Sequence, residues 1–150
     1  PKDRPETIYR LDGFQTVLSE NNHILPDENI QTGDYQSSSG FQLVDDWLKE
    51  GKPLDGVFAC SDLMAIGALE ACRKNGRVVG EDISIIGFDD IPFAQFSSPP
   101  LTTISQNIFK VGETLVHKLM QYMEDQIVTK SILPIELSIR QSTAISSDHN

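Results

Sequence analysis

Polar side chains with binding chemistry stand at the ends of three apolar segments of this sequence. They are Asp34 and Tyr35, Ser61 and Asp62, and Asp89 and Asp90. Carboxylates accept hydrogen bonds from neighbouring hydroxyl groups, and a flat aromatic ring stacks on the apolar face of a sugar or a base. Arg10, near the start of the chain, adds a planar fork of donors. Together these residue types suit the recognition of a neutral polyhydroxylated molecule.

Each of these residues also has an ordinary structural interpretation. Ser61 is a good helix N-cap, and Asp62 is favoured in the first turn of a helix. Strand-end aspartates such as Asp89 often cap the helix that follows them. Tyr35 fits a surface ring, and Arg10 fits a solvated position on a helix. The sequence pattern alone leaves both interpretations open.

Patterns typical of catalysis or metal binding are missing from the sequence. There is no GxSxG elbow, no P-loop and no GxGxxG turn after a strand. Asp89 and Asp90 are sequential neighbours, which fits the facing carboxylates of a glycosidase poorly. The three histidines lie far apart, and Cys60 and Cys72 have no metal-ligand spacing. We therefore predict no enzyme, no cofactor and no metal site, and we expect the two thiols to be reduced and buried.

The composition is that of an ordinary soluble domain with a strong negative charge. A chain of 150 residues that is 39% hydrophobic and 23% charged suits one globular domain. The formal net charge of -10 repels polyanions, so we do not expect this segment to hold DNA or an acidic membrane. No apolar run approaches the roughly 20 residues of a membrane-spanning helix, and the charged start has no signal-peptide pattern. Because the sequence begins without Met, we expect a piece of a longer protein.

Helical and strand periodicities alternate along the chain. Helices are predicted at 3–21, 37–50, 62–74 and 109–125, with a helical turn at 92–96. Strands are predicted at 30–32, 54–60, 83–88, 101–105 and 133–140. This alternation predicts an α/β fold, a parallel sheet flanked by helices on both faces. Right-handed crossovers place the C-terminal ends of the strands on one rim, where open sheets of this kind bind ligands.

Several segments together carry a resemblance to a known family. Residues 56–106 read GVFACSDLMAIGALEACRKNGRVVGEDISIIGFDDIPFAQFSSPPLTTISQ, and this stretch closely resembles the lactose-repressor/galactose-repressor family of transcription regulators. YRLDGF at 9–14, GDYQSSSG at 33–40, the glycine at 112 and RQST at 140–143 fall where that family's patterns place them. The resemblance covers nearly the whole chain, and its specificity comes from the ordered set of motifs.

The resemblance implies a domain organisation that extends beyond this chain. It implies part of a two-lobed, periplasmic-binding-protein-like (type I) effector-binding domain. The C-terminal lobe would be mainly 1–104 and 131–145, while 105–128 would form a crossover and a helix of the other lobe. The helix-turn-helix that reads DNA in such a regulator would be absent from this chain. The apolar stripe of the helix at 109–125 would then lack its usual partner sheet.

The resemblance also implies a set of effector-binding residues. Carried over position by position, they are Arg10, Tyr35, Ser61, Asp62, Asp89 and Gln106. Arg10 matches the effector-contacting arginine, Tyr35 the stacking aromatic residue, and Asp89 the strand-end aspartate that accepts from ligand hydroxyls or ring nitrogens. Ser61 departs from the pattern, because many sugar-responsive members carry asparagine there, and a hydroxyl lacks the paired donor and acceptor of an amide. The identity of the ligand therefore stays open.

The resemblance finally implies partners and a location. The protein would be a cytoplasmic homodimer, with Ile66 and the segment around Phe96 at the contact, although both residues are equally explained as core. It would sense a sugar or sugar-like effector and bind operator DNA through the absent helix-turn-helix. One alternative is the periplasmic sugar-binding protein of a transporter, which has the same two-lobed fold, and another is a sugar hydrolase.

Overall fold

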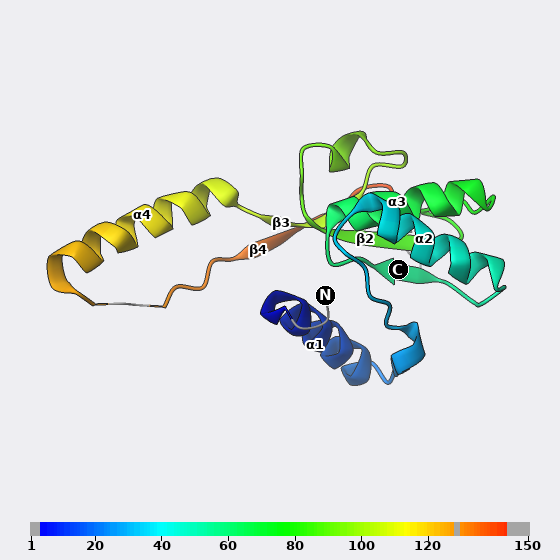
Figure 1. The fold of residues 1–150 in the computed structure, drawn as a ribbon, viewed down its shortest axis with the longest axis horizontal. Coiled ribbons are helices and arrows are strands. Elements are labelled where there is room, and N and C mark those ends of the chain that lie inside the picture. The colour runs from blue at the N-terminus through cyan, green and yellow to red at the C-terminus, as the bar shows by residue number, and fades with distance from the viewer. Residues whose placement is uncertain (1–3, 128–129, 144–150) are drawn as a thin grey trace, which may run out of the picture.

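Four strands form one mixed sheet in the order β1-β2-β3-β4 (Figure 1). The protein is described by a computed structural model that covers residues 4–127 and 130–143. The strands are β1 (Gly56–Phe58), β2 (Ser84–Asp89), β3 (Thr102–Gln106) and β4 (Ile135–Ser138). β1, β2 and β3 are parallel, and β4 runs antiparallel to β3. The predicted parallel sheet is thus correct for three strands, while the returning strand reverses direction.

Four α-helices and two short 3-10 turns connect and flank the strands. They are α1 (Pro5–Glu20), η1 (Asp27–Asn29), α2 (Ser37–Lys49), α3 (Asp62–Lys74), η2 (Ala94–Phe96) and α4 (Ile108–Asp125). The predicted helices all form, with bounds within a few residues of those expected. The predicted start of the first helix at Asp3 lies outside the described residues, as do 144 and 145 of the predicted C-terminal lobe.

The hydrophobic core lies between the sheet and the α2–α3 pair. Ile83, Ile85 and Leu101 are fully buried against small residues of α3 such as Ala65. α2 and α3 approach closely because Gly67 has no side chain. A Cβ added there would lie 1.9 Å from the carbonyl oxygen of Ser37, which is far below any van der Waals distance. This close packing joins the two helices and the sheet in one hydrophobic core.

Helix α1 covers the opposite face of the sheet, apart from α2 and α3 (Figure 1). Side chains alternate between the faces of a strand. Val57 packs on the core side, and Phe58 faces α1, where its ring stacks on Phe14 with 5.2 Å between centroids. No residue of α1 is fully buried. The helix is therefore held by a few specific contacts, which include those of Arg10.

Strands β3 and β4 continue away from the core into α4, which stands apart from the rest of the chain (Figure 1). No residue of α4 is buried. Its apolar stripe is exposed, with Leu115 at 63%, Leu119 at 58% and Met123 at 73% of full accessibility. The stripe is therefore uncovered by the other described residues, and its usual partner sheet in another lobe stays a prediction. Among these residues, no helix combines the length and apolarity needed to cross a membrane.

Two strand predictions need correction. Residues 30–32 have extended backbone but join no sheet, since the N–H of Ile30 donates to the carbonyl of Asp27 and closes the η1 turn. The strand predicted at 54–60 is limited to Gly56–Phe58 and is only half-buried. The reason is its place at the edge of the sheet, where no further strand covers it.

Candidate functional site

Asp89 ends β2 and stands beside Gln106, which ends the neighbouring strand β3. In the β2–β3 ladder Asp89 pairs with Ser105, so that Gln106 lies one residue further along the same edge. The Nε2 of Gln106 donates to Oδ1 of Asp89 at 3.0 Å. The parallel strands therefore bring two predicted site residues into contact at the rim where they were expected.

Arg10 reaches the same rim from α1. Its Nη1 donates to the carbonyl of Cys60 at 2.6 Å, and its Nη2 lies 3.9 Å from Oδ1 of Asp89. The guanidinium also covers the ring of Phe88, 3.6 Å from the centroid, which is favourable for a cation on an aromatic face. Only 16% of the side chain is exposed. Arg10 is thus an anchored residue at the ends of β1 and β2, and its interpretation as a solvated helix residue is wrong.

Asp89 is electrostatically poised to accept a donor. The pKa of this carboxyl is raised overall, mainly by burial. The cation of Arg10 and the hydrogen bond from Gln106 lower the pKa, while the negative charge of Asp62 raises it further. A half-buried carboxylate that is incompletely compensated gains from further hydrogen-bond donors. The hydroxyl groups of a bound molecule are donors of the right kind.

Tyr35 joins this group through α1. Its hydroxyl shares a hydrogen bond of 2.5 Å with Oγ1 of Thr7, which lies on α1 one turn before Arg10. The guanidinium of Arg4 lies 5.2 Å from the centre of the Tyr35 ring. The backbone of Tyr35 has a φ of 69°, a conformation that is uncommon for residues other than glycine. The ring is thus fixed near the α1 end that carries Arg10.

Ser61 and Asp62 are buried, and their polar atoms are satisfied within the protein. Ser61 caps α3, since its Oγ accepts from the N–H of Met64 at 3.3 Å, so its structural interpretation is confirmed. Asp62 is fully buried and ties two other elements together. Its Oδ2 accepts from the N–H of Ile91 at 2.8 Å, and its Oδ1 accepts from Oγ1 of Thr103 at 2.5 Å. Effector contact by Ser61 and Asp62 stays a prediction.

Asp90 differs from its neighbour because both of its oxygens are occupied. Oδ1 accepts from Nη2 of Arg140 at 2.7 Å, and Oδ2 accepts from Oγ of Ser138 at 3.0 Å. Burial raises the pKa of Asp90, but the hydrogen bonds from Arg140 and Ser138, the positive charge of Arg140 and a hydrogen bond from Ser105 together lower the pKa overall. Arg140 was part of the RQST motif, but nothing in the sequence paired it with a residue 50 positions upstream. Sequence analysis therefore missed this ion pair.

The remaining candidates have structural roles. Asp34 fits turn chemistry, since its Oδ1 accepts from the N–H of Gln36 at 2.9 Å. The pKa of Asp34 is lowered, mostly by its hydrogen bond with Ser39 and to a smaller extent by its hydrogen bond with the backbone of Gln36. Cys72 is buried, which raises the pKa of its thiol to about 11, and Cys60 is half-buried with its pKa raised by the same cause. Thiols of this kind are poorly reactive at neutral pH.

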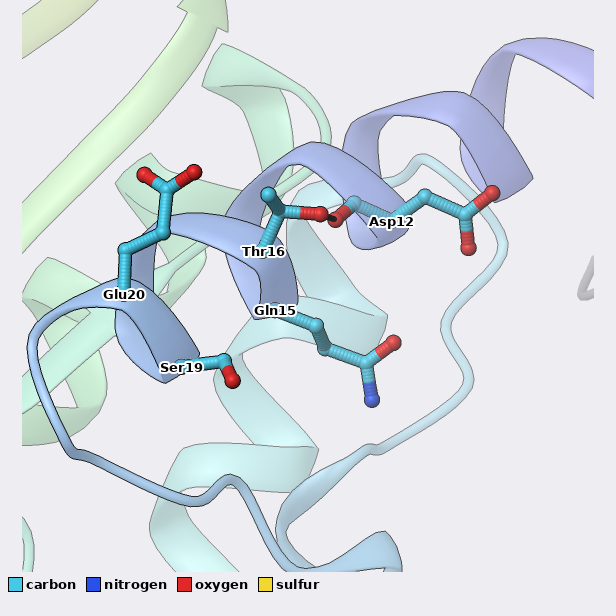
Figure 2. A pocket seen from close by; sticks show the side chains of 5 residues that line it. All are labelled: Asp12, Gln15, Thr16, Ser19 and Glu20. Carbon is cyan, nitrogen blue, oxygen red and sulfur yellow. Dashed lines mark hydrogen bonds between the residues drawn. The ribbon is translucent and has the colours of Figure 1, made fainter.

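A separate hollow lies along α1 (Figure 2). It is lined by Asp12, Gln15, Thr16, Ser19 and Glu20. All five residues come from this one helix, and the hydroxyl of Thr16 donates to the carbonyl of Asp12 within it. In the part of the chain that the structure describes, no second element lines this hollow, so we do not regard it as a binding site. Within 4–127 and 130–143, no three His, Cys, Asp or Glu side chains are grouped to hold a metal ion.

Comparison with known proteins identifies the family. Residues 1–143 match the model of the periplasmic binding protein-like domain. The chain belongs to this family. Within this family it resembles regulators of the lactose-repressor/galactose-repressor type, as the motifs predicted, and the predicted fold is confirmed as well.

The most similar curated proteins include transcription regulators of several bacteria. The HTH-type transcriptional regulator MalR of Clostridium butyricum is 39% identical over 135 residues, which are 89% of this chain and 40% of that protein. The HTH-type transcriptional repressor CytR of Escherichia coli is 37% identical over 95% of this chain and 42% of that protein. The chain thus spans about two fifths of these relatives. Their names favour a regulator over the sugar-binding protein of a transporter.

Solved structures of this family give the same result. A dimeric Lac repressor superposes with a TM-score of 0.88 at 35% identity, covering 96% of this chain and 53% of that one. A transcription regulator from Lactobacillus plantarum superposes with a TM-score of 0.89 at 33% identity, covering 95% and 55%. The periplasmic binding protein-like fold of this chain is therefore that of known regulators.

The two residues predicted at a dimer contact have different environments. Ile66 is half-buried on α3 and packs against the core, while Phe96 in η2 is 74% exposed. The core interpretation therefore holds for Ile66 and not for Phe96. A dimer contact stays a prediction for both residues.

Proposed function

We propose that this chain is the effector-sensing and dimerisation part of a DNA-binding transcription regulator. A sugar or sugar-like molecule binds at the rim formed by Arg10, Asp89 and Gln106, with Tyr35 beside it. The observation that carries the proposal is the convergence of Arg10 and Gln106 on the half-buried carboxylate of Asp89. In this proposal Ser61 and Asp62, which begin α3 after β1, also contact the ligand.

The chemistry of the rim favours a neutral, hydroxyl-rich ligand. Asp89 supplies acceptors, and Arg10 supplies donors beyond the one already bonded to Cys60. The carboxylate of Asp89 and the guanidinium of Arg10 carry opposite charges and lie close together, which disfavours a strongly charged ligand. The net charge of -10 also disfavours direct contact with DNA, so operator binding is assigned to a helix-turn-helix in the longer protein.

The arm that leads to α4 supports an allosteric role. In the proposal, β3 and β4 cross to a second lobe, and the exposed stripe of α4 packs against it. Effector binding between the lobes changes their relative orientation, which requires a difference in effector affinity between two states of about 1–3 kcal/mol. A homodimer contact that includes Phe96 and Ile66 carries the change to the DNA-binding modules.

The proposed protein is a cytoplasmic sensor and does not catalyse a reaction. No cofactor or metal is assigned to it. The relatives with named functions are regulators, and the rim offers no nucleophile paired with a base. Tyr35, Asp89 and Asp90 have positive φ values at the rim, and strain of this kind is found at ligand-binding sites as well as at catalytic ones.

The test uses the full-length protein and its operator. A thermal-shift screen of sugars and nucleosides first identifies a compound that stabilises it, and operator release by that compound is then followed by fluorescence anisotropy. Asp89→Ala should weaken the response to the compound by about tenfold or more, because a hydrogen bond to a charged group is worth about 1.5–3 kcal/mol. Operator affinity without the compound should not change.

Asp55→Ala is the matched control, since Asp55 is an exposed aspartate before β1 and away from the rim. This variant should respond like the wild type. An unaltered response of Asp89→Ala would count against the proposed function.

A further inference from the structure

The turn that follows β2 has an unusual backbone. Asp89 has a φ of 118° and Asp90 has a φ of 53°. Residues other than glycine rarely adopt positive φ values. Two such residues in succession persist only where surrounding contacts hold them. The residues that supply those contacts therefore determine where the carboxylate of Asp89 points.

Arg140 holds this turn from the side of the returning strand. Its Nη2 donates to Asp90 at 2.7 Å, and its Nη1 donates to the carbonyl of Leu101 at 2.7 Å. The planar fork thus joins the start of β3 to the turn at the end of β2. Ser138 of β4 adds the second contact to Asp90, at 3.0 Å.

Two buried side chains, those of Thr103 and Asp62, also hold this turn. The N–H of Asp90 lies 3.4 Å from Oγ1 of Thr103, and Thr103 in turn donates to Asp62. Asp62 also accepts the N–H of Ile91. Asp89 itself contributes little to holding the turn, because among residues 4–127 and 130–143 its carboxylate is hydrogen-bonded by Gln106 and lies 3.9 Å from Arg10.

We propose that Asp90 and Arg140 are positioning residues for the effector site, whose ion pair holds the left-handed turn that aims the Asp89 carboxylate at Gln106 and Arg10. The inference rests on the proposed function only for the role of Asp89 toward an effector. The two adjacent aspartates thus have separate tasks: Asp89 faces the ligand, and Asp90 fixes the backbone. Since Ser138 belongs to β4 and Arg140 follows it, the site is tied directly to the strand that returns from α4.

The experiment is a titration of the Asp89 carboxyl carbon by NMR in the full-length protein, so no effector is needed. The wild type should titrate above the usual aspartate pKa of about 3.9, because Asp89 is half-buried. In Arg140→Met the turn should relax and expose Asp89, which lowers its pKa. Loss of the positive charge alone would raise the pKa, so the direction of the change separates the two causes.

Two further variants, Asp90→Gly and Asp90→Ala, both remove the negative charge of Asp90 and differ in the backbone conformations they accept. Asp90→Gly accepts the positive φ without strain, whereas Asp90→Ala does not. We expect Asp89 to keep a pKa close to that of the wild type in Asp90→Gly and to shift further in Asp90→Ala. If Arg140→Met does not fold, this pair still tests whether the positive φ at position 90 must be held by side-chain contacts to place Asp89.

Arg73→Met is the control, since Arg73 forms an exposed ion pair with Glu70 on α3, away from the turn. It should leave the titration of Asp89 unchanged. A raised Asp89 pKa in Arg140→Met, or equal values in Asp90→Ala and Asp90→Gly, would overturn the proposal. The effector response in the operator assay is a separate readout from the titration of Asp89. The proposed function can therefore fail while the positioning role stands, and the positioning role can fail while the proposed function stands.

Discussion

Helices α2 and α4 both carry a clear apolar stripe, but the two stripes have different surroundings. In α2, Val44 is buried against the core, and the helix packs closely on α3. In α4, Leu119 is 58% exposed, and nothing on the helix is buried. The spacing of apolar residues therefore predicts which face of a helix packs against another element. It does not predict which element covers that face. Among the described residues, the stripe of α2 is covered by the core and the stripe of α4 is exposed.

The largest expected contrast is between two aliphatic side chains. Ile85 is fully buried in β2, so Ile85→Ala should lower the free energy of unfolding by about 2–5 kcal/mol. Leu119→Ala removes a side chain that is 58% exposed and should change the free energy of unfolding by no more than about 0.5 kcal/mol. Equilibrium urea unfolding of the 150-residue chain measures both. Equal losses would contradict the division into core and arm.

The same substitution of Leu119 can be repeated in the longer protein that we propose. If the second lobe covers α4 there, Leu119→Ala should become costly, at about 2–5 kcal/mol. A cost that stays small in the longer protein would show that the stripe remains uncovered.

Two glycines give an intermediate contrast of opposite sign. Gly67 faces the carbonyl of Ser37, so Gly67→Ala forces α2 and α3 apart and should cost about 1–3 kcal/mol. Gly112 lies on α4 with no atom within 4 Å of an added Cβ, so Gly112→Ala should stabilise the helix by about 0.5–1 kcal/mol. Thermal unfolding of the two variants measures the changes. Destabilisation by Gly112→Ala would mean that α4 is packed more closely than it is here.

The smallest expected contrast between core and arm is in how the free energy of unfolding depends on pH below about 4. Asp45 is buried between α2 and α3 and accepts from Lys49, Asn75 and Lys74, which lowers its pKa. A lowered folded-state pKa stabilises the protein above the usual aspartate pKa of about 3.9, and this stability is lost as the pH falls toward the folded-state pKa. Asp45→Asn should therefore flatten the dependence of the unfolding free energy on pH below about 4.

The matched control on the arm is Glu113→Gln. Glu113 pairs with Lys110 at 3.0 Å on the exposed surface of α4, and such pairs contribute little to stability. Urea unfolding at several acidic pH values should leave the dependence of this variant on pH like that of the wild type. An Asp45→Asn variant with an unchanged acid limb would remove Asp45 from the account of the core.

The features predicted well from the sequence are those set by local signals. Ser61 caps α3 and Asn75 with Gly76 ends it, as expected. The order of the elements placed Asp89 at the rim, because the ends of parallel strands share one edge of a sheet. Gln106 was predicted from the family resemblance, and its hydrogen bond with Asp89 puts it at the same rim.

The features that the sequence did not reveal depend on distant partners. Asp90 is bound by Arg140, and Asp62 by Thr103, at separations of 50 and 41 residues. The segment at 30–32 has a strand-like composition, but the Ile30 N–H is used by the η1 turn. Local periodicity contains no information on which long-range partner takes a hydrogen bond, so these outcomes required the folded structure.

The most direct test of the effector site is a crystal structure of the full-length protein with a compound that stabilises it. The account predicts hydroxyl groups of that compound within hydrogen-bonding distance of Asp89 and Arg10, with the ring of Tyr35 against its apolar face. A compound bound instead in the hollow along α1, or one that makes no hydrogen bond with Asp89 or Arg10, would contradict the account.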